Sequence, residues 1–139
     1  MTQTPQLSEN ARTFLNEPRF GVMATINADG TPQQSVVWYE LQGDEIMLNT
    51  KGGRLKDRNL RRDPRAALCI EDGNHYVALR GPVTLNDDQT VAQSDIERLA
   101  VRYDGAEKAR AQVRSQFSRE ARVTIRLRPE RIDEYGMEG

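Results

Sequence analysis

Short runs in which apolar and polar residues alternate, each closed by residues typical of tight turns, constrain the fold of this chain most strongly. The first run covers residues 20–26 and is followed by a turn sequence at 27–30; a second run covers 33–41 and a third covers 45–49. Alternation with a period of two predicts β-strands that bury one face. Connections this short allow only antiparallel pairing, so we expect these three strands to be antiparallel neighbours.

Further runs of the same kind continue toward the C-terminus, and segments with helical spacing lie between them. Pro64 ends one predicted helix and Gly105 interrupts another, while Pro82 suggests an edge or a bulge in its strand. The whole chain, residues 1–139, is expected to form one domain, a mainly β barrel of six or seven antiparallel strands with peripheral helices. The additional strands are expected at 65–71, 75–85, 122–127 and 129–132, and the helices at 7–15, 54–63 and 88–117.

Charge and cysteine content exclude several classes of protein. The chain carries 20 basic and 21 acidic residues, a net charge of −1, which gives no overall attraction to nucleic acid or to anionic membranes. No apolar run approaches the roughly 20 residues that cross a bilayer, and the N-terminus lacks the pattern of a secretory signal. Cys69 is the only cysteine, so no internal disulfide is possible and a reducing compartment is expected. We therefore expect a cytoplasmic protein with no membrane or nucleic-acid partner.

One segment departs sharply from this balance. Residues 51–65 contain seven basic and two acidic residues, and hence a local charge of +5. A Gly-Gly loop here leads directly into the expected helix, and free backbone N–H groups at a helix start attract anions. Arg54 can form two parallel hydrogen bonds to a phosphate and Lys56 adds a point charge, while Asn59 follows on the same side of the helix. The segment is either a site for a phosphorylated ligand or a charged helix that only faces solvent.

Other chemistry finds little support in the residues. His75 is the only histidine, and together with a single cysteine it offers neither a metal-ligand cluster nor a catalytic triad. His75 is either a proton donor near a ligand or a surface turn residue. Trp38 could line a ring-binding pocket or pack between sheets. Trp38 and Tyr39 are the only nearby aromatic residues that could stack on bases, which disfavours a nucleic-acid site.

Three stretches resemble the split β-barrel superfamily of pyridoxamine-phosphate-oxidase-like proteins. The central stretch, residues 49–65, places a basic loop between a strand end and a short helix that ends in Asp-Pro. Its final residues, Arg-Asn-Leu-Arg-Arg-Asp-Pro-Arg, are similar to those of small enzymes that use the deazaflavin coenzyme F420. The opening residues 20–25, with the turn 29–32, and the closing residues 123–132 are similar too. The resemblance covers nearly the whole chain and implies a six- to seven-stranded antiparallel split β-barrel.

The resemblance also implies a cofactor site. Lys56 corresponds to the family's phosphate-binding lysine and Arg54 to its neighbouring arginine. A second subunit normally completes this pocket, so a homodimer with the site at the subunit interface is implied. The other implied cofactor-binding positions are Ser35, Val36, Val37 and Trp38 along the cofactor's tail and ring, Asn49 and Thr50 at the strand end that faces the ring, and Asn59 on the following helix.

The implied activity is hydride transfer from reduced F420 to a small conjugated or unsaturated substrate. An FMN-dependent oxidoreductase of the same fold and a non-enzymatic flavin- or deazaflavin-binding protein are the alternatives. The activity of the pyridoxamine phosphate oxidases themselves is not expected. Those enzymes have a basic residue in the strand that corresponds to residues 33–36 and a histidine-containing segment near the C-terminus, whereas here residues 33–36 carry no basic side chain and residues 133–136 no histidine. No catalytic residue is assigned, since the cofactor performs the chemistry while the protein binds and orients it.

Overall fold

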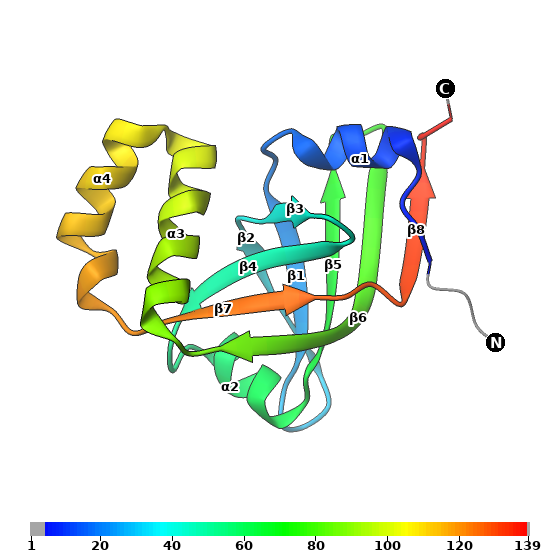
Figure 1. Cartoon of the computed structure of the whole chain (residues 1–139). Coiled ribbons are helices and arrows are strands. Elements are labelled where there is room, and N and C mark those ends of the chain that lie inside the picture. The colour runs from blue at the N-terminus through cyan, green and yellow to red at the C-terminus, as the bar shows by residue number, and fades with distance from the viewer. Residues whose placement is uncertain (1–4, 139) are drawn as a thin grey trace.

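A computed structural model describes residues 5–138, in which eight strands and four α-helices form one curled sheet with helices around it (Figure 1). The mainly β architecture with peripheral helices is as the sequence predicted. The elements are α1 (Glu9–Asn16), β1 (Gly21–Ile26), β2 (Pro32–Val37), β3 (Glu40–Gln42), β4 (Glu45–Lys51), α2 (Leu55–Arg62), β5 (Arg65–Glu71), β6 (Tyr76–Asn86), α3 (Gln89–Asp104), α4 (Ala106–Ser115), a 3-10 turn (Phe117–Arg119), β7 (Arg122–Leu127) and β8 (Arg131–Tyr135).

The sheet is antiparallel throughout and follows the order β2-β1-β5-β6-β7-β4-β3, with β8 paired to β6. The long strand β6 curls it, because residues 76–80 pair with both β5 and β8 whereas residues 83–86 pair with β7. The change of partner falls at Gly81, where a Cβ atom would lie 2.2 Å from the Arg128 carbonyl oxygen. Only glycine fits there. Pro82, expected at an edge or a bulge, lies beside Gly81 at this bend.

One sequence expectation is wrong in part. The predicted strand 33–41 is divided into β2 and β3, which raises the number of strands to eight within the described residues. The first predicted pair, β1 with β2, is confirmed, but β2 and β4 lie toward opposite ends of the sheet. The chain leaves β2 at Trp38 and Tyr39. The buried Tyr39 hydroxyl donates to the Leu15 carbonyl oxygen at 2.9 Å, and its backbone N–H donates to the Tyr103 hydroxyl at 3.1 Å, so helices rather than a strand partner hold this segment.

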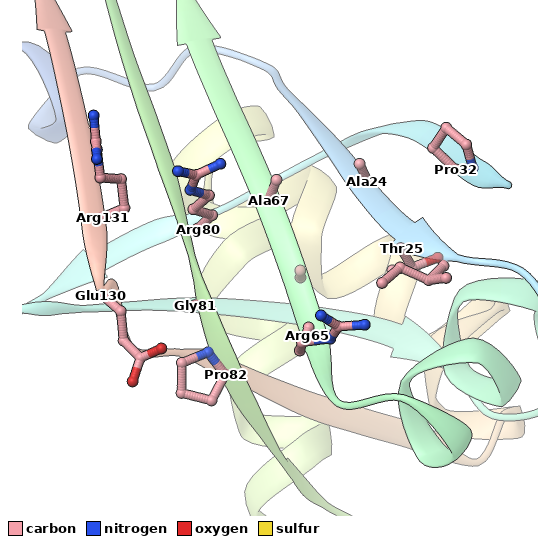
Figure 2. A pocket seen from close by; sticks show the side chains of 12 residues that line it. Ala24, Thr25, Pro32, Arg65, Ala67, Arg80, Gly81, Pro82, Glu130 and Arg131 are labelled. Carbon is pink, nitrogen blue, oxygen red and sulfur yellow. The ribbon is translucent and has the colours of Figure 1, made fainter. Parts of the chain in front are cut away.

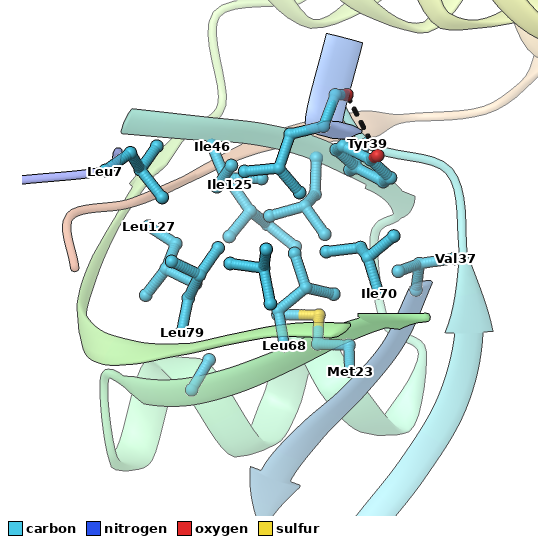
Figure 3. Packing of buried hydrophobic residues seen from close by; sticks show 14 of the residues in the cluster. Leu7, Met23, Val37, Tyr39, Ile46, Leu68, Ile70, Leu79, Ile125 and Leu127 are labelled. Atoms are coloured by element: carbon cyan, nitrogen blue, oxygen red, sulfur yellow. Dashed lines mark hydrogen bonds between the residues drawn. The ribbon is translucent and has the colours of Figure 1, made fainter. Parts of the chain in front are cut away.

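The inner face of the curled sheet forms the main core (Figure 3). Helix α1 closes one end of this core with Phe14 and Leu15, and α2 closes the other with Leu60. A second, smaller cluster lies where α3 and α4 pack on the outside of β4, around Met47 and Leu99. The space between this second cluster and the start of α2 contains the candidate site. The main-core side chains labelled in Figure 3 are Leu7, Met23, Val37, Tyr39, Ile46, Leu68, Ile70, Leu79, Ile125 and Leu127.

Candidate functional site

The basic segment forms a tight loop that is held from within the chain. The Gly53 N–H donates to Asp57 Oδ2 at 2.8 Å, and the Gly52 N–H donates to the Ala121 carbonyl oxygen at 2.7 Å. Asp57 also accepts from Arg61 Nε at 2.9 Å and is buried. The two glycine N–H groups expected to attract an anion are therefore already occupied. An anion would therefore be bound by side chains of this loop and of the first turn of α2.

Those side chains lie on a cavity of about 210 Å³ between α2, the end of β2, α3 and the 3-10 turn. We call it the cationic pocket. Six of the nine predicted cofactor-binding residues line this pocket. These six come from three separate elements, so their spacing in the sequence alone does not bring them together. The complete lining is Val36, Val37, Trp38, Asn49, Arg54, Lys56, Ile96, Leu99, Gln116, Phe117 and Arg122.

The electrostatics of the cationic pocket favour an anion. Neither Arg54 nor Lys56 forms an ion pair within residues 5–138. Burial lowers the pKa of Lys56, and the positive charges of Arg54 and Arg122 lower that pKa further. The positive charges of Arg54 and Lys56 repel each other, and a bound anion would relieve that repulsion.

Arg122 is a residue of this pocket that the sequence reasoning missed. It is only 5% exposed, its Nε donates to Asn49 Oδ1 at 3.0 Å, and its Nη1 donates to Glu120 Oε1 at 2.8 Å. Its guanidinium carbon lies 5.1 Å from the centre of the Phe117 ring. The register of β4 and β7 pairs Lys51 with Arg122, which brings the arginine to the base of the basic loop. That register could not be read from the sequence, where Arg122 resembles the other charged residues of its strand.

Three predicted residues lie outside the lining of the pocket. Asn59 was expected beside Lys56, but it is buried and its Nδ2 donates to Thr25 Oγ1 and Asn27 Oδ1, each at 3.0 Å. It ties α2 to β1 instead. The hydroxyl oxygens of Ser35 and Thr50 are also buried, and neither has a hydrogen-bond partner among the described residues. Thr50 alternates with Leu48 and Ile46 on the core face of β4, so its side chain is turned away from the pocket.

An aromatic stack fixes one wall of the pocket. The Trp38 ring stacks on Tyr103 with 5.2 Å between ring centres and 8° between ring planes, and the Phe20 ring also stacks on Tyr103, with 5.8 Å between ring centres. The Tyr103 hydroxyl donates to the Arg19 carbonyl oxygen at 2.7 Å. Trp38 thus packs on Tyr103 of α3 and also lines the pocket, so the pocket combines a flat apolar side chain with the cations Arg54 and Lys56.

A second cavity, of about 530 Å³, lies on the outer face of the sheet (Figure 2). Ala24, Ala67 and Gly81 contribute to its apolar floor, and three arginines rim it. Arg65 forms an ion pair with Asp63 at 2.8 Å, and Arg131 forms one with Asp133 at 3.5 Å. Two of the three arginines of this cavity therefore already have a carboxylate partner. Its lining is Ala24, Thr25, Ile26, Pro32, Arg65, Ala66, Ala67, Arg80, Gly81, Pro82, Glu130 and Arg131.

The outer face of the sheet also presents apolar side chains to solvent. Val22 on β1 is 40% exposed and its cross-strand neighbour Val36 on β2 is 67% exposed. Val36 also lines the cationic pocket. The apolar outer face and the pocket therefore meet at this residue.

The only histidine lies at the other end of the barrel. The turn between β5 and β6, which contains His75, lies near α1, whereas α2 closes the opposite end (Figure 1). The His75 Nδ1 lies 2.9 Å from Asp72 Oδ2, and the His75 ring centre lies 6.4 Å from that of Phe14. Residues 5–138 contain no group of three or more His, Cys, Asp or Glu residues arranged to hold a metal ion. None of the described helices is both long and apolar enough to span a membrane.

Comparison with known proteins agrees with this geometry. The model of the family "Pyridoxamine 5'-phosphate oxidase" matches residues 7–136. An F420H(2)-dependent biliverdin reductase of Mycobacterium tuberculosis is 29% identical over 102 residues, which cover 72% of this chain and 74% of that protein. The solved structure of an F420 reductase is 28% identical with a TM-score of 0.74, covering 91% of this chain and 98% of that one. A conserved hypothetical protein from Mycobacterium tuberculosis is also 28% identical, with a TM-score of 0.81 and coverage of 99% and 91%.

Proposed function

The chain belongs to the pyridoxamine 5'-phosphate oxidase family, and on that basis we propose that it is an oxidoreductase that uses reduced coenzyme F420 to reduce a small conjugated or unsaturated substrate. The observation that carries the proposal is that Arg54 and Lys56, which form no ion pair within residues 5–138, line the same pocket as the Trp38 ring. The names of two relatives at 28–29% identity support F420 as the cofactor.

The residues of the cationic pocket fit a phosphorylated cofactor with a flat ring. Lys56 and Arg54 would hold its phosphate by charge-assisted hydrogen bonds, and Trp38 with Val36 and Val37 would contact the apolar part. When bound, reduced F420 supplies the hydride. FMN, which carries a phosphate and a similar ring, is the alternative cofactor for the same residues.

The chain's own contribution is to bind, orient and exclude water. The pocket lining contains no histidine, aspartate or glutamate, and its one amine, Lys56, is assigned to the phosphate, so no acid–base group is named. Its apolar half is formed by Val37, Ile96, Leu99 and Phe117, which would exclude water from the ring of a bound cofactor. In an enzyme whose cofactor carries the reactive hydride, this binding and shielding are what the protein supplies.

We also propose that the chain acts as a homodimer with the cofactor at the subunit interface. The cationic pocket encloses about 210 Å³, whereas pockets for cofactors and other small ligands enclose roughly 300–1,000 Å³. One chain therefore surrounds only part of such a ligand. The exposed Val36 belongs both to the lining of the pocket and to the apolar outer face. A second copy of the chain that covers this apolar face would therefore also enclose the cofactor.

Two measurements on the purified protein test the function. The first is a titration with F420 and, separately, with FMN, followed by coenzyme fluorescence. The second is protein-dependent oxidation of reduced F420 in the presence of biliverdin, the acceptor in the name of the mycobacterial relative, and of simpler conjugated acceptors. We expect F420 to bind and an acceptor to be reduced. Tight FMN binding without F420 binding would favour the alternative cofactor, and binding of F420 without reduction of any acceptor would contradict the enzymatic function.

A further inference from the structure

Arg122 occupies an unusual position for an arginine that is only 5% exposed. It is the first residue of β7, opposite Lys51 at the end of β4, and it shares the cationic pocket with Arg54 and Lys56. Burying a guanidinium is costly unless its hydrogen bonds and its charge are satisfied. The way in which Arg122 meets this requirement leaves part of the guanidinium available.

Two of the three guanidinium nitrogens are engaged. Nε donates to Asn49 Oδ1 at 3.0 Å, and Nη1 donates to Glu120 Oε1 at 2.8 Å. No hydrogen bond from Nη2 exists within the described part of the chain. Because the guanidinium is planar, fixing Nε and Nη1 also fixes the direction in which Nη2 presents its two hydrogens. Asn49 is itself held in place, since its Nδ2 donates to the Ala92 carbonyl oxygen at 2.9 Å.

The charge around Arg122 is also incompletely balanced. Among the described residues Glu120 is its one carboxylate partner, and Glu120 Oε2 also lies 3.7 Å from Lys51 Nζ. The lining of the pocket holds three cations and no carboxylate. Burial lowers the pKa of Arg122 and the positive charge of Arg54 acts in the same direction, while Glu120 opposes both. A bound anion would therefore interact favourably with three cations rather than two.

We propose that Arg122 is a third anion-binding residue of the cationic pocket, which donates from Nη2 to the cofactor's phosphate while Asn49 and Glu120 position its guanidinium. The inference rests on the proposed function, because it assumes that a phosphorylated cofactor occupies this pocket. It assigns to β7 a direct part in binding, in addition to the loop and the first turn of α2. The competing interpretation is that Arg122 only connects β4 to the segment before β7.

The test compares Arg122→Gln and Arg122→Lys with Lys56→Ala and with the control Arg119→Gln, which changes an exposed arginine in the adjacent 3-10 turn. Each protein is titrated with F420 and with FMN, inorganic phosphate is used as a competitor, and the melting temperature is recorded. A hydrogen bond to an ionised group corresponds to about a tenfold to a hundredfold change in affinity. We expect a loss of that size for Arg122→Gln, a smaller loss for Arg122→Lys, and none for Arg119→Gln.

The outcomes separate this inference from the proposed function. Loss of binding in Lys56→Ala but not in Arg122→Gln, with a lowered melting temperature in the latter, would show that Arg122 is structural and overturn the inference alone. A wild-type protein that binds neither coenzyme would overturn both. Should Arg122→Gln fail to fold, Arg122→Lys decides the question, because a lysine cannot donate to Asn49, Glu120 and a phosphate from one plane. Unchanged affinity and unchanged phosphate competition in Arg122→Lys would then refute the role.

Discussion

Replacing Lys56 by alanine should weaken cofactor binding without weakening the fold. Lys56 is half-buried on the cationic pocket and forms no ion pair within residues 5–138, so its charge is available to a ligand. A charge-assisted hydrogen bond contributes about 1.5–3 kcal/mol, which corresponds to about a tenfold to a hundredfold loss of affinity. We therefore expect the dissociation constant for F420 to rise by that factor.

The effect on stability should be neutral or opposite in sign. Burial and two neighbouring cations, Arg54 and Arg122, lower the pKa of Lys56, which means that its charged form is disfavoured in the unliganded protein. Removing the amine removes that repulsion. A residue that improves binding at the expense of stability is typical of a functional site rather than of a structural one. The melting temperature of Lys56→Ala without cofactor should equal or exceed that of the wild type.

Fluorescence titration with F420 and thermal unfolding without ligand measure the two effects on the same samples. The matched control is Arg58→Ala, which removes an exposed cation from the same helix that does not line the pocket. Arg62 is a poorer control, because its Nη2 bonds to Asn59 Oδ1 at 3.2 Å. Equal losses of affinity in Lys56→Ala and Arg58→Ala would indicate a diffuse positive field. A marked fall in melting temperature in Lys56→Ala would show that the reasoning about its burial is wrong.

Three further changes test other parts of the structure. Val22→Asp places a charge on the apolar outer face and should convert the proposed dimer to a monomer in light scattering; an intact dimer would place the interface elsewhere. A hydrogen bond from the backbone N–H of Asn74 holds the pKa of the Asp72 carboxyl at about 2, below its ordinary 3.8. The stabilisation that this carboxylate gives is therefore present above pH 3.8 and lost as the pH falls through about 2. The difference in melting temperature between wild type and Asp72→Asn should shrink across that window, and a constant difference would contradict this. Tyr39→Phe removes the hydrogen bond to the Leu15 carbonyl oxygen and should cost about 1 kcal/mol in urea unfolding; no loss would show that Arg102, which also bonds to this oxygen, suffices.

Features determined by neighbouring residues could be predicted from the sequence. Ser8 belongs to a residue type that favours helix N-termini, and it caps α1 with its Oγ, which accepts from the Ala11 N–H at 3.1 Å. Gly105 was expected to interrupt the long helical segment, and it separates α3 from α4 with a φ of 89°. Both are local consequences of residue type, in one case a hydroxyl acceptor and in the other freedom at positive φ.

Features that depend on distant parts of the chain could not be predicted. The division of the second strand follows from contacts of Tyr39 with Leu15 and Tyr103, which lie 24 and 64 residues away. Asn59 faces β1 because its side-chain amide donates to the Thr25 hydroxyl. The sequence of this eight-residue helix is polar on several sides and does not indicate which side faces the sheet. Arg122 reaches the pocket only through the register of β4 and β7. In each case the local sequence is compatible with more than one arrangement, and tertiary contacts determine which one forms.

A crystal structure of the protein with F420 bound tests the central claim most directly, because arginines also border the larger cavity on the outer face of the sheet. The site proposed here requires a phosphate oxygen at about 3 Å from Lys56 Nζ and from the Arg54 guanidinium, with the ring beside Trp38. A phosphate bound instead among Arg65, Arg80 and Arg131 on the outer face (Figure 2), with Lys56 and Arg54 free of contact to the cofactor, would contradict the claim.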